Sequence, residues 1–208
     1  MNEFLQQFIK GIHATTWYES MAVFTGIASV WFSRKEHILV YPIGLINTIT
    51  YIFICAEGDL FGEMSVNFYY TIMNIYGWYL WLKKDEQQNF VLHVSFSDKK
   101  WAKYQIIFFA ATYIVVYISL LLLKKYFYKE TIPFADAFAT ATAFTGMWLM
   151  TKKKVESWYW WIATNIVSIP LYFVKHYVFT SVYYLVLLVM AVFGLITWMQ
   201  KAKKAATN

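Results

Sequence analysis

Seven apolar segments, each 17 to 23 residues long, constrain the fold of this chain more than any other feature of its sequence. They lie at 17–33, 38–56, 64–82, 101–123, 134–150, 157–175 and 181–199. A helix of about 20 apolar residues spans about 30 Å of hydrocarbon, where each backbone hydrogen bond must be satisfied within the protein. The sequence therefore predicts an all-α polytopic membrane protein with seven transmembrane helices.

The overall composition agrees with lipid as the main solvent. Of the 208 residues, 60% are hydrophobic and 14% are charged, whereas soluble domains average about 45–50% apolar and about 25% charged residues. The single cysteine, Cys55, excludes a disulfide framework and a Cys-rich metal site. The four histidines lie at segment ends or in loops and form no ligand pattern. We therefore predict no catalytic residue, no metal and no cofactor, and we do not expect an enzyme.

Basic residues gather on one side of the predicted membrane. The loops after the first, third and fifth segments and the C-terminal tail carry most of the Lys and Arg residues, including Lys152, Lys153 and Lys154. Positively charged loops tend to stay on the cytoplasmic side. We therefore predict an N-terminus outside the cell and a C-terminus in the cytoplasm. The net charge of +6 reflects this distribution, and no nucleic-acid partner is predicted.

Two parts of the chain resemble each other at an offset of 117 to 118 residues. The matching pairs are Trp31 and Trp148, Asn47 and Asn165, Gly77 and Gly194, and Trp81 and Trp198. Three helices, one inverting helix and three more helices give two bundles of the same orientation. Parallel repeats of this kind are typical of transporters that bind their solute between the halves, near the midplane. The two glycines are predicted to be close-packing positions.

The predicted domain boundaries follow from this repeat and from the loops. Within the long loop, Phe90, Leu92, Val94 and Phe96 alternate with other residues as in a strand, but we favour a solvated connector. The parts are an N-terminal interfacial segment at 1–16, a first three-helix bundle at 17–82, a cytoplasmic loop at 83–100, a linking helix at 101–123, a second three-helix bundle at 134–199 and a cytoplasmic tail at 200–208.

One face of the third segment carries amides and aromatic rings. These side chains recur at helical spacing, at Asn67, Tyr70, Asn74, Trp78 and Trp81. Carboxamides are costly in hydrocarbon unless they bond another helix or a solute. Tryptophans at helix ends usually belong to the interfacial aromatic belt, and we favour that position for Trp81 and its counterpart Trp198.

The sixth segment repeats this combination with Trp158, Trp161 and Asn165 on one helical face. A flat heteroaromatic ring can stack on indole, while an amide donates and accepts hydrogen bonds to its substituents. An aromatic lining also attracts a cation. For Asn47, which matches Asn165 across the repeat, interhelical bonding and solute contact are equally compatible with the sequence.

The spans carry ionisable side chains only near their ends, at Glu19, Glu63, Asp136 and Lys175. Proton-coupled pumps place such groups within the bilayer. The nucleotide-binding pattern GxxxxGK[ST] does not occur in the sequence. We therefore infer passive transport that uses no energy source.

Three motifs together resemble the PnuC-type nicotinamide riboside transporters. They are LVYPIGLIN at 39–47, NxxYxxxNIYGWYLW at 67–81 and TKKKVESWYWWIATNIVS at 151–168. The resemblance extends from about residue 17 to about residue 200. The chain departs from the family pattern at Asn67, where the family often has Gln.

The resemblance implies a fold of two parallel three-helix bundles joined by a central helix, an arrangement of 3+1+3 helices as in the sugar-transporting SWEET proteins. It implies facilitated diffusion of an unphosphorylated vitamin precursor across the bacterial inner membrane, followed by trapping through a cytosolic kinase. It also implies a homo-oligomer, for which a trimer is the expected form. Carried over by position, Asn74, Trp158, Trp161 and Asn165 would line the solute site.

The leading hypothesis is therefore a facilitator of nicotinamide riboside. Trp158 and Trp161 would stack on the pyridinium ring, Tyr70 would support them, and the three amides Asn67, Asn74 and Asn165 would bond the carboxamide or the ribose. A facilitator of thiamine, or of another flat cationic vitamin precursor, is the alternative within the family. A membrane-embedded enzyme and a structural membrane protein are the alternatives from other classes.

Overall fold

The computed structural model describes residues 6, 16–57, 61–124 and 131–207. Nearly all of the predicted interfacial segment at 1–16 lies outside the described residues. Within them, each of the seven predicted spans is a helix. The helices are α2 (Trp17–Arg34), α3 (Val40–Glu57), α4 (Phe61–Leu82), α5 (Lys99–Lys124), α6 (Pro133–Thr151), α7 (Ser157–Val174) and α8 (Val178–Thr207).

Local sequence signals explain several helix ends. Thr16 and Glu19 form a capping box at the start of α2, in which each side chain bonds the backbone N–H of the other residue. Pro133 begins α6, where its missing N–H costs no helical hydrogen bond. Pro170 lies inside α7, which continues to Val174. The last helix extends past the predicted end of its apolar segment at 199 and reaches Thr207.

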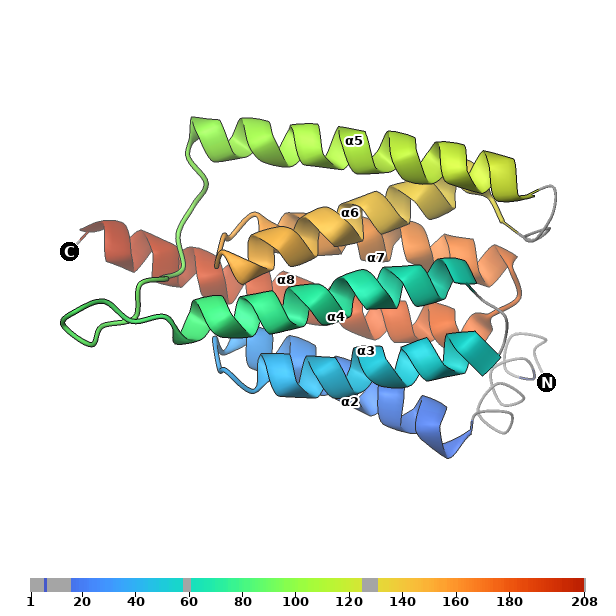
Figure 1. Cartoon of the computed structure of the whole chain (residues 1–208), viewed down its shortest axis with the longest axis horizontal. Coiled ribbons are helices and arrows are strands. Elements are labelled where there is room, and N and C mark those ends of the chain that lie inside the picture. Colours follow the sequence, from blue (N-terminus) through green and yellow to red (C-terminus); the bar gives the residue numbers. More distant parts are fainter. Residues whose placement is uncertain (1–5, 7–15, 58–60, 125–130, 208) are drawn as a thin grey trace.

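The described helices form a ring with one helix outside it (Figure 1). Helices α2, α3 and α4 pack in succession, and so do α6, α7 and α8. Between these two groups α4 contacts α6, and α2 contacts α8, which closes a ring of six helices. Helix α5 packs against α6 on the outside of the ring. Its Gln105 side chain also accepts a hydrogen bond from the Trp160 indole of α7.

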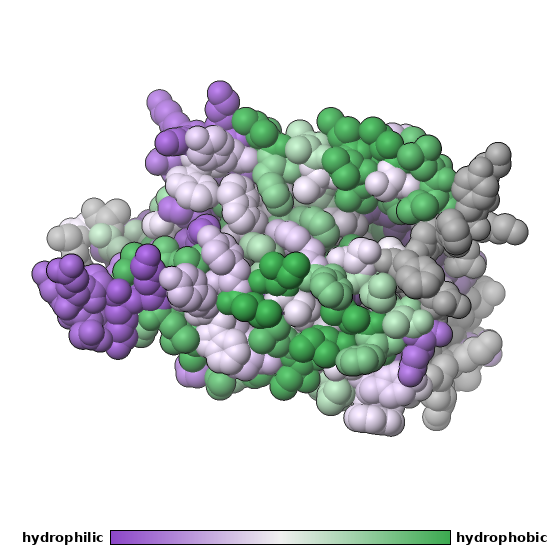
Figure 2. Space-filling view, viewed as in Figure 1, coloured by the Kyte–Doolittle hydropathy of each residue, from purple (hydrophilic) through white to green (hydrophobic). Residues whose placement is uncertain are grey.

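The surface has the hydropathy of a membrane protein. Hydrophobic side chains cover the middle of the helices, and hydrophilic ones gather at the end that holds the α4–α5 connection and the C-terminus (Figure 2). Among the described helices, α3, α5 and α8 meet strict criteria of length and hydropathy for a membrane span. The end with the α2–α3, α4–α5 and α6–α7 connections and the C-terminus is called the basic end below.

The connection between α4 and α5 is more ordered than we predicted from the sequence. Val94 is 6% exposed and packs into the core of the basic end. Ser95 pairs with the α6–α7 connection through two backbone hydrogen bonds, and the Ser97 N–H and hydroxyl donate to the Glu156 carboxylate. Residues 91–98, which we call the strap, are therefore a connector with exposed side chains, as predicted, but Val94 and the bonds of Ser95 and Ser97 tie it to the basic end. Of the alternating apolar residues in this connection, Val94 is buried, whereas Phe90 and Phe96 are exposed.

Candidate functional site

Three contacts at the basic end join residues that lie 117 positions apart. The Ser33 hydroxyl contacts the Met150 sulfur at 3.0 Å, and Glu36 pairs with Lys153 at 3.5 Å. The rings of Trp81 and Trp198 have centroids 6.3 Å apart. Residues at equivalent positions of two repeats touch each other only where they lie beside a two-fold axis. The contacts are therefore those expected of a pseudo-two-fold axis through the basic end.

Four large aromatic side chains close the ring of helices at this end. They are Tyr41, Trp81, Trp158 and Trp198, which we call the aromatic plug. Tyr41 and Trp81 meet edge to face at 5.0 Å, and Trp158 and Trp198, which lie 117 positions later, meet in the same way at 5.5 Å. A Cβ atom on Gly77 would lie 2.4 Å from the Tyr41 ring, and one on Gly194 would lie 2.5 Å from the Trp158 ring. The prediction that both glycines are close-packing positions is thus confirmed.

The plug corrects the prediction of an aromatic belt at these positions. Trp81 is 4% exposed and Trp198 is fully buried, so neither faces a membrane interface. The reason is the repeat itself, because each tryptophan packs against an aromatic ring of its own half and against its equivalent in the other half. Trp158, predicted to stack on a solute, is 1% exposed within the same plug.

A second aromatic cluster joins α4, α6 and α7. The Tyr70 ring of α4 lies 6.2 Å from the Trp161 ring of α7 and 6.0 Å from Phe144 of α6. Tyr69 stacks on Phe144 at 3.9 Å. A Cβ atom on Gly146 would lie 3.3 Å from the Trp161 indole, so the absence of a side chain there admits this ring. The structure thus brings together two of the predicted site residues, Tyr70 and Trp161, across the two groups of helices.

Asn165 lies one turn from Trp161 on α7 and is 3% exposed. Its equivalent at an offset of 117 is Thr48, whose hydroxyl accepts a hydrogen bond from Thr71 of α4. The residue 117 positions after Thr71 is Leu188, which offers no hydrogen-bonding group. Within the described residues no hydrogen bond satisfies the Asn165 carboxamide. Its oxygen and nitrogen are not completely shielded, because neither is among the fully buried polar atoms that lack a partner. The amide is therefore available to a solute.

Asn74 of α4 is the second buried amide of this kind. It is 4% exposed, and a Cβ atom on Gly44 of α3 would lie 2.6 Å from its side-chain oxygen. Gly44 is the equivalent of Trp161 at an offset of 117. At this level the first group of helices therefore has Gly44, covered by the Asn74 amide, whereas the second group has the Trp161 indole.

The remaining two amides of the predicted site bond the protein backbone. The Asn47 side chain donates to the Ala22 carbonyl of α2, which makes it an interhelical contact. In the structure its equivalent is Thr164, which bonds Thr142 of α6, so both residues tie the middle helix of their group to the first. The Asn67 side chain donates to the Glu63 carbonyl one turn earlier on α4. Both amide oxygens keep their capacity to accept a hydrogen bond.

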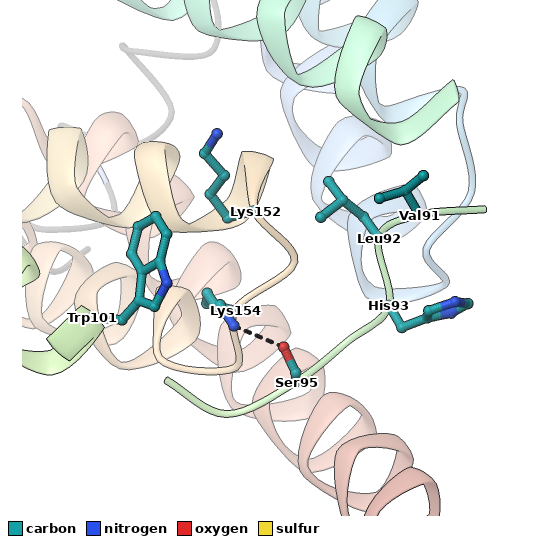
Figure 3. Close-up of a pocket in the computed structure, with 7 residues that line it drawn as sticks. All are labelled: Val91, Leu92, His93, Ser95, Trp101, Lys152 and Lys154. Carbon is teal, nitrogen blue, oxygen red and sulfur yellow. Dashed lines mark hydrogen bonds between the residues drawn. The ribbon is translucent and has the colours of Figure 1, made fainter. Parts of the chain in front are cut away.

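A cavity of about 370 Å³ lies at the basic end, away from these residues. Val91, Leu92, His93 and Ser95 line it from the strap side, and Trp101, Lys152 and Lys154 complete it (Figure 3). The Lys154 ammonium donates to the Ser95 hydroxyl, and Lys152 donates to the Tyr76 hydroxyl. Because the strap and the α6–α7 connection form its walls, this cavity lies outside the ring of six helices.

Sequence reasoning missed Tyr41, Gly44 and Thr48. Their signal was present as the offset of 117, which pairs them with Trp158, Trp161 and Asn165 respectively. The sequence analysis overlooked this offset at these positions because the paired residues are of different types. A search for identical residues finds only positions where both halves have the same side chain.

Comparison with known proteins gives a consistent result. Residues 16–200 match the sequence model of the family described as "Nicotinamide mononucleotide transporter". The chain is 23% identical to the nicotinamide riboside transporter PnuC of Escherichia coli K12 over 218 aligned residues, which cover 95% of this chain and 91% of the relative. It is 27% identical to the nicotinamide riboside transporter PnuC of Neisseria mucosa, with 96% of this chain and 78% of the relative covered.

Two further similarities concern substrate range and fold. The riboflavin/roseoflavin transporter RibM of Streptomyces davaonensis is 22% identical over 90% of this chain and 87% of its own length. A crystal structure of the vitamin B3 transporter PnuC superposes with a TM-score of 0.70 at 22% identity, and the match covers 97% of this chain and 88% of that one. This structural likeness establishes the fold.

Proposed function

Because this chain belongs to the nicotinamide mononucleotide transporter family, whose PnuC-type members it resembles along its length, we propose that it carries nicotinamide riboside across the bacterial inner membrane by facilitated diffusion. A cytosolic kinase would then phosphorylate the solute and trap it. The observation that carries the proposal is the pairing of Tyr70 and Trp161 across the two groups of helices, beside a buried amide, Asn165, that bonds no residue in the described part of the chain.

The proposed architecture is a SWEET-like arrangement of two parallel three-helix bundles, α2–α4 and α6–α8, joined by α5. Its support is the set of contacts between equivalent residues at an offset of 117, together with the closed ring of six helices. The basic end faces the cytoplasm in this proposal because positively charged loops are retained there. The N-terminus is then outside and the C-terminus inside.

The proposed solute site combines flat rings with free amides. Trp161 and Tyr70 would contact the faces of the pyridinium ring, and Asn165 and Asn74 would bond its carboxamide or the ribose hydroxyls. Trp158 would reach the solute only after the plug moves, because it is 1% exposed in the present state. Asn67 would contribute through its amide oxygen, since its nitrogen already donates to a backbone carbonyl. Asn47 serves instead as the interhelical contact to Ala22.

Charge favours the riboside over the mononucleotide named in the family description. A phosphate dianion in the bilayer needs a cationic partner. The six helices of the ring carry no Lys, Arg or His between residues 17–33, 40–57, 61–82, 133–151, 157–174 and 178–200. Aromatic rings instead attract a cation. The proposed solute is therefore an unphosphorylated cation.

Riboflavin is a second candidate because a relative that transports it aligns over most of this chain. Thiamine remains the alternative expected from the sequence, since it is also a flat cationic heterocycle. Calorimetric titration of the purified protein with nicotinamide riboside, nicotinamide mononucleotide, riboflavin and thiamine separates the four. Tight binding of any of the other three, with none of the riboside, would refute the proposed solute.

Passive transport has its own test. Proteoliposomes that contain the protein should take up labelled riboside until inside and outside concentrations are equal. Uptake that rises above this level when a proton or sodium gradient is imposed would contradict facilitated diffusion. A homo-oligomer, with a trimer as the expected form, is also part of the proposal, and light scattering of the detergent-solubilised protein measures its mass.

A further inference from the structure

The aromatic plug contains polar atoms that the closed state leaves unsatisfied. Among the described residues, the Tyr41 hydroxyl and the indole nitrogens of Trp81 and Trp158 are fully buried and have no hydrogen-bond partner. All three belong to the plug, whereas the fourth ring, Trp198, donates to the Arg34 carbonyl. A buried donor without a partner costs free energy that water would return on opening. The closed plug therefore needs interactions elsewhere that hold it shut.

Glu36 supplies such an interaction across the two groups of helices. It lies in the α2–α3 connection and pairs with Lys153 of the α6–α7 connection at 3.5 Å and with Lys201 of α8 at 2.6 Å. The third ion pair among the described residues, Asp136 with Lys175, joins α6 to the end of α7 within one group. Glu36 is thus the carboxylate in both ion pairs that cross between the groups in the described part of the chain.

Lys153 depends on Glu36 because it is desolvated. It is 8% exposed, and its ammonium lies 4.6 Å from the centre of the Trp81 ring of the plug. Burial lowers the pKa of Lys153, and the Glu36 carboxylate acts in the opposite direction. Without that carboxylate the buried ammonium would be left with the Trp81 ring and with the repulsion of Lys201, and hydration would draw it toward the solvent at the basic end.

The backbone fixes both partners in place. Glu36 and Lys153 each have a left-handed φ, 55° and 51°, at equivalent positions of the two connections. The strap adds a cover on the solvent side, because Ser95 pairs with the backbone on either side of Lys154 and Val94 packs on the plug. Release of Lys153 would therefore move the connection that anchors the strap.

We propose that Glu36 and Lys153 form a latch that keeps the solute path closed at the basic end. Glu36 holds the desolvated ammonium of Lys153 against Trp81, across the pseudo-two-fold axis. Loss of the carboxylate charge releases Lys153 to water and opens the plug. The latch rests on the proposed function, since a path across the membrane is what such a plug would close.

A cysteine reporter measures the opening directly. Ser157 is fully buried, and its hydroxyl faces the Met150 sulfur at 4.0 Å beside the plug. In a Cys55→Ser background, Ser157→Cys places the only thiol next to the latch with little change in volume. Labelling of this thiol with a bulky, charged maleimide in lipid nanodiscs, where both faces are accessible, reports how often the plug opens.

Four variants in this background test the latch. Glu36→Gln should accelerate labelling by about ten-fold or more, because it leaves a buried cation without its counter-charge. Glu36→Gln combined with Lys153→Met should restore slow labelling, because no cation remains to be expelled. Lys175→Met removes an ion pair of similar burial at the other end and should label as slowly as the parent. Lys201→Met, which removes the more exposed partner of Glu36, should change the rate by less than about three-fold.

Three results would overturn the latch. They are slow labelling of Glu36→Gln, fast labelling of the double variant, and equally fast labelling of Lys175→Met, which would indicate general loosening. Thermal unfolding of each variant identifies the last case independently. The labelling needs no solute, so it tests the latch separately from the proposed function. The labelling can refute the latch while the parent still takes up riboside, and uptake can be absent while the labelling supports the latch.

Discussion

Asn165 offers the sharpest test of the proposed solute site, because its amide is buried and bonds no described residue, while Asn47 in the other half donates to a backbone carbonyl. Replacing Asn165 by Ala removes two N–H donors and one acceptor oxygen from α7. If the solute carboxamide or a ribose hydroxyl pairs with it, the variant leaves that solute group desolvated and unpaired. Such a loss costs about 1–3 kcal/mol, which is about a 5- to 150-fold increase in Kd.

The matched control is Asn47→Ala. The Asn47 amide already donates to the Ala22 carbonyl of α2. Its removal therefore leaves a backbone acceptor unsatisfied between two helices and should lower the Tm, while the riboside Kd changes by less than about three-fold. Asn165→Ala should do the opposite and leave the Tm close to that of the parent, because no described residue loses a hydrogen bond.

Isothermal titration calorimetry with nicotinamide riboside and differential scanning fluorimetry on the same samples give both quantities. An unchanged Kd in Asn165→Ala would remove Asn165 from the site. A weakened Kd in Asn47→Ala with an unchanged Tm would show instead that Asn47 contacts the solute, as one of the two alternatives from the sequence requires.

Three further predictions concern the packing and charge of the two groups of helices. Gly194→Ala places a Cβ atom 2.5 Å from a plug ring, so the ring must shift, and thermal unfolding should reveal a destabilisation of about 1–3 kcal/mol. Leu188→Thr supplies at α8 the hydroxyl that Thr71 supplies at α4, so it should bond Asn165 and raise the riboside Kd by about three- to ten-fold, as titration would show; an unchanged Kd would argue against this pairing. Because the pKa of Lys153 lies below its ordinary value of 10.5, the unfolded chain binds this proton more tightly, and stability rises with pH between the two values. The Tm of the parent should therefore rise relative to that of Lys153→Met as the pH approaches 10.5, and a constant difference would contradict a desolvated ammonium.

The seven helices could be predicted from the sequence because their signal is local. Each apolar segment must form a helix in lipid whatever its neighbours are, and all seven segments are helical in the structure. The strap could not be predicted in the same way. Its order depends on Val94 meeting the core of the basic end and on Ser95 meeting a connection about 60 residues later in the chain. Neither contact leaves a trace in local composition.

The candidate site was predictable in its residue types but not in its pairings. Helical spacing places Trp158, Trp161 and Asn165 on one face of α7, but it does not say which of them meets the other helices. In the structure Trp158 packs on Gly194 and is shut inside the plug, whereas Trp161 meets Tyr70 of the opposite group. The difference of one turn along α7 separates a closing residue from a candidate solute contact.

The positions where the two halves agree and those where they differ have different roles. The plug repeats its geometry, because Tyr41 meets Trp81 in the first half in the same edge-to-face contact in which Trp158 meets Trp198 in the second. A symmetric closure needs the same shape on both sides, which explains why large aromatic rings occupy all four positions.

A small asymmetric solute imposes the opposite requirement. The proposed riboside would present a flat cationic ring to one side and hydroxyl groups to the other, so two identical half-sites would match it poorly. Trp161 faces the interior where the first half has Gly44, and Asn165 is free where its equivalent, Thr48, is bonded to Thr71. Replacing Gly44 by Trp would make the two halves alike at this level. Because a Cβ atom at 44 would already lie 2.6 Å from the Asn74 side chain, the added indole must displace that amide, which is a proposed solute contact. Riboside binding in calorimetry should then be lost, and retained binding would place the solute somewhere other than between Gly44 and Trp161.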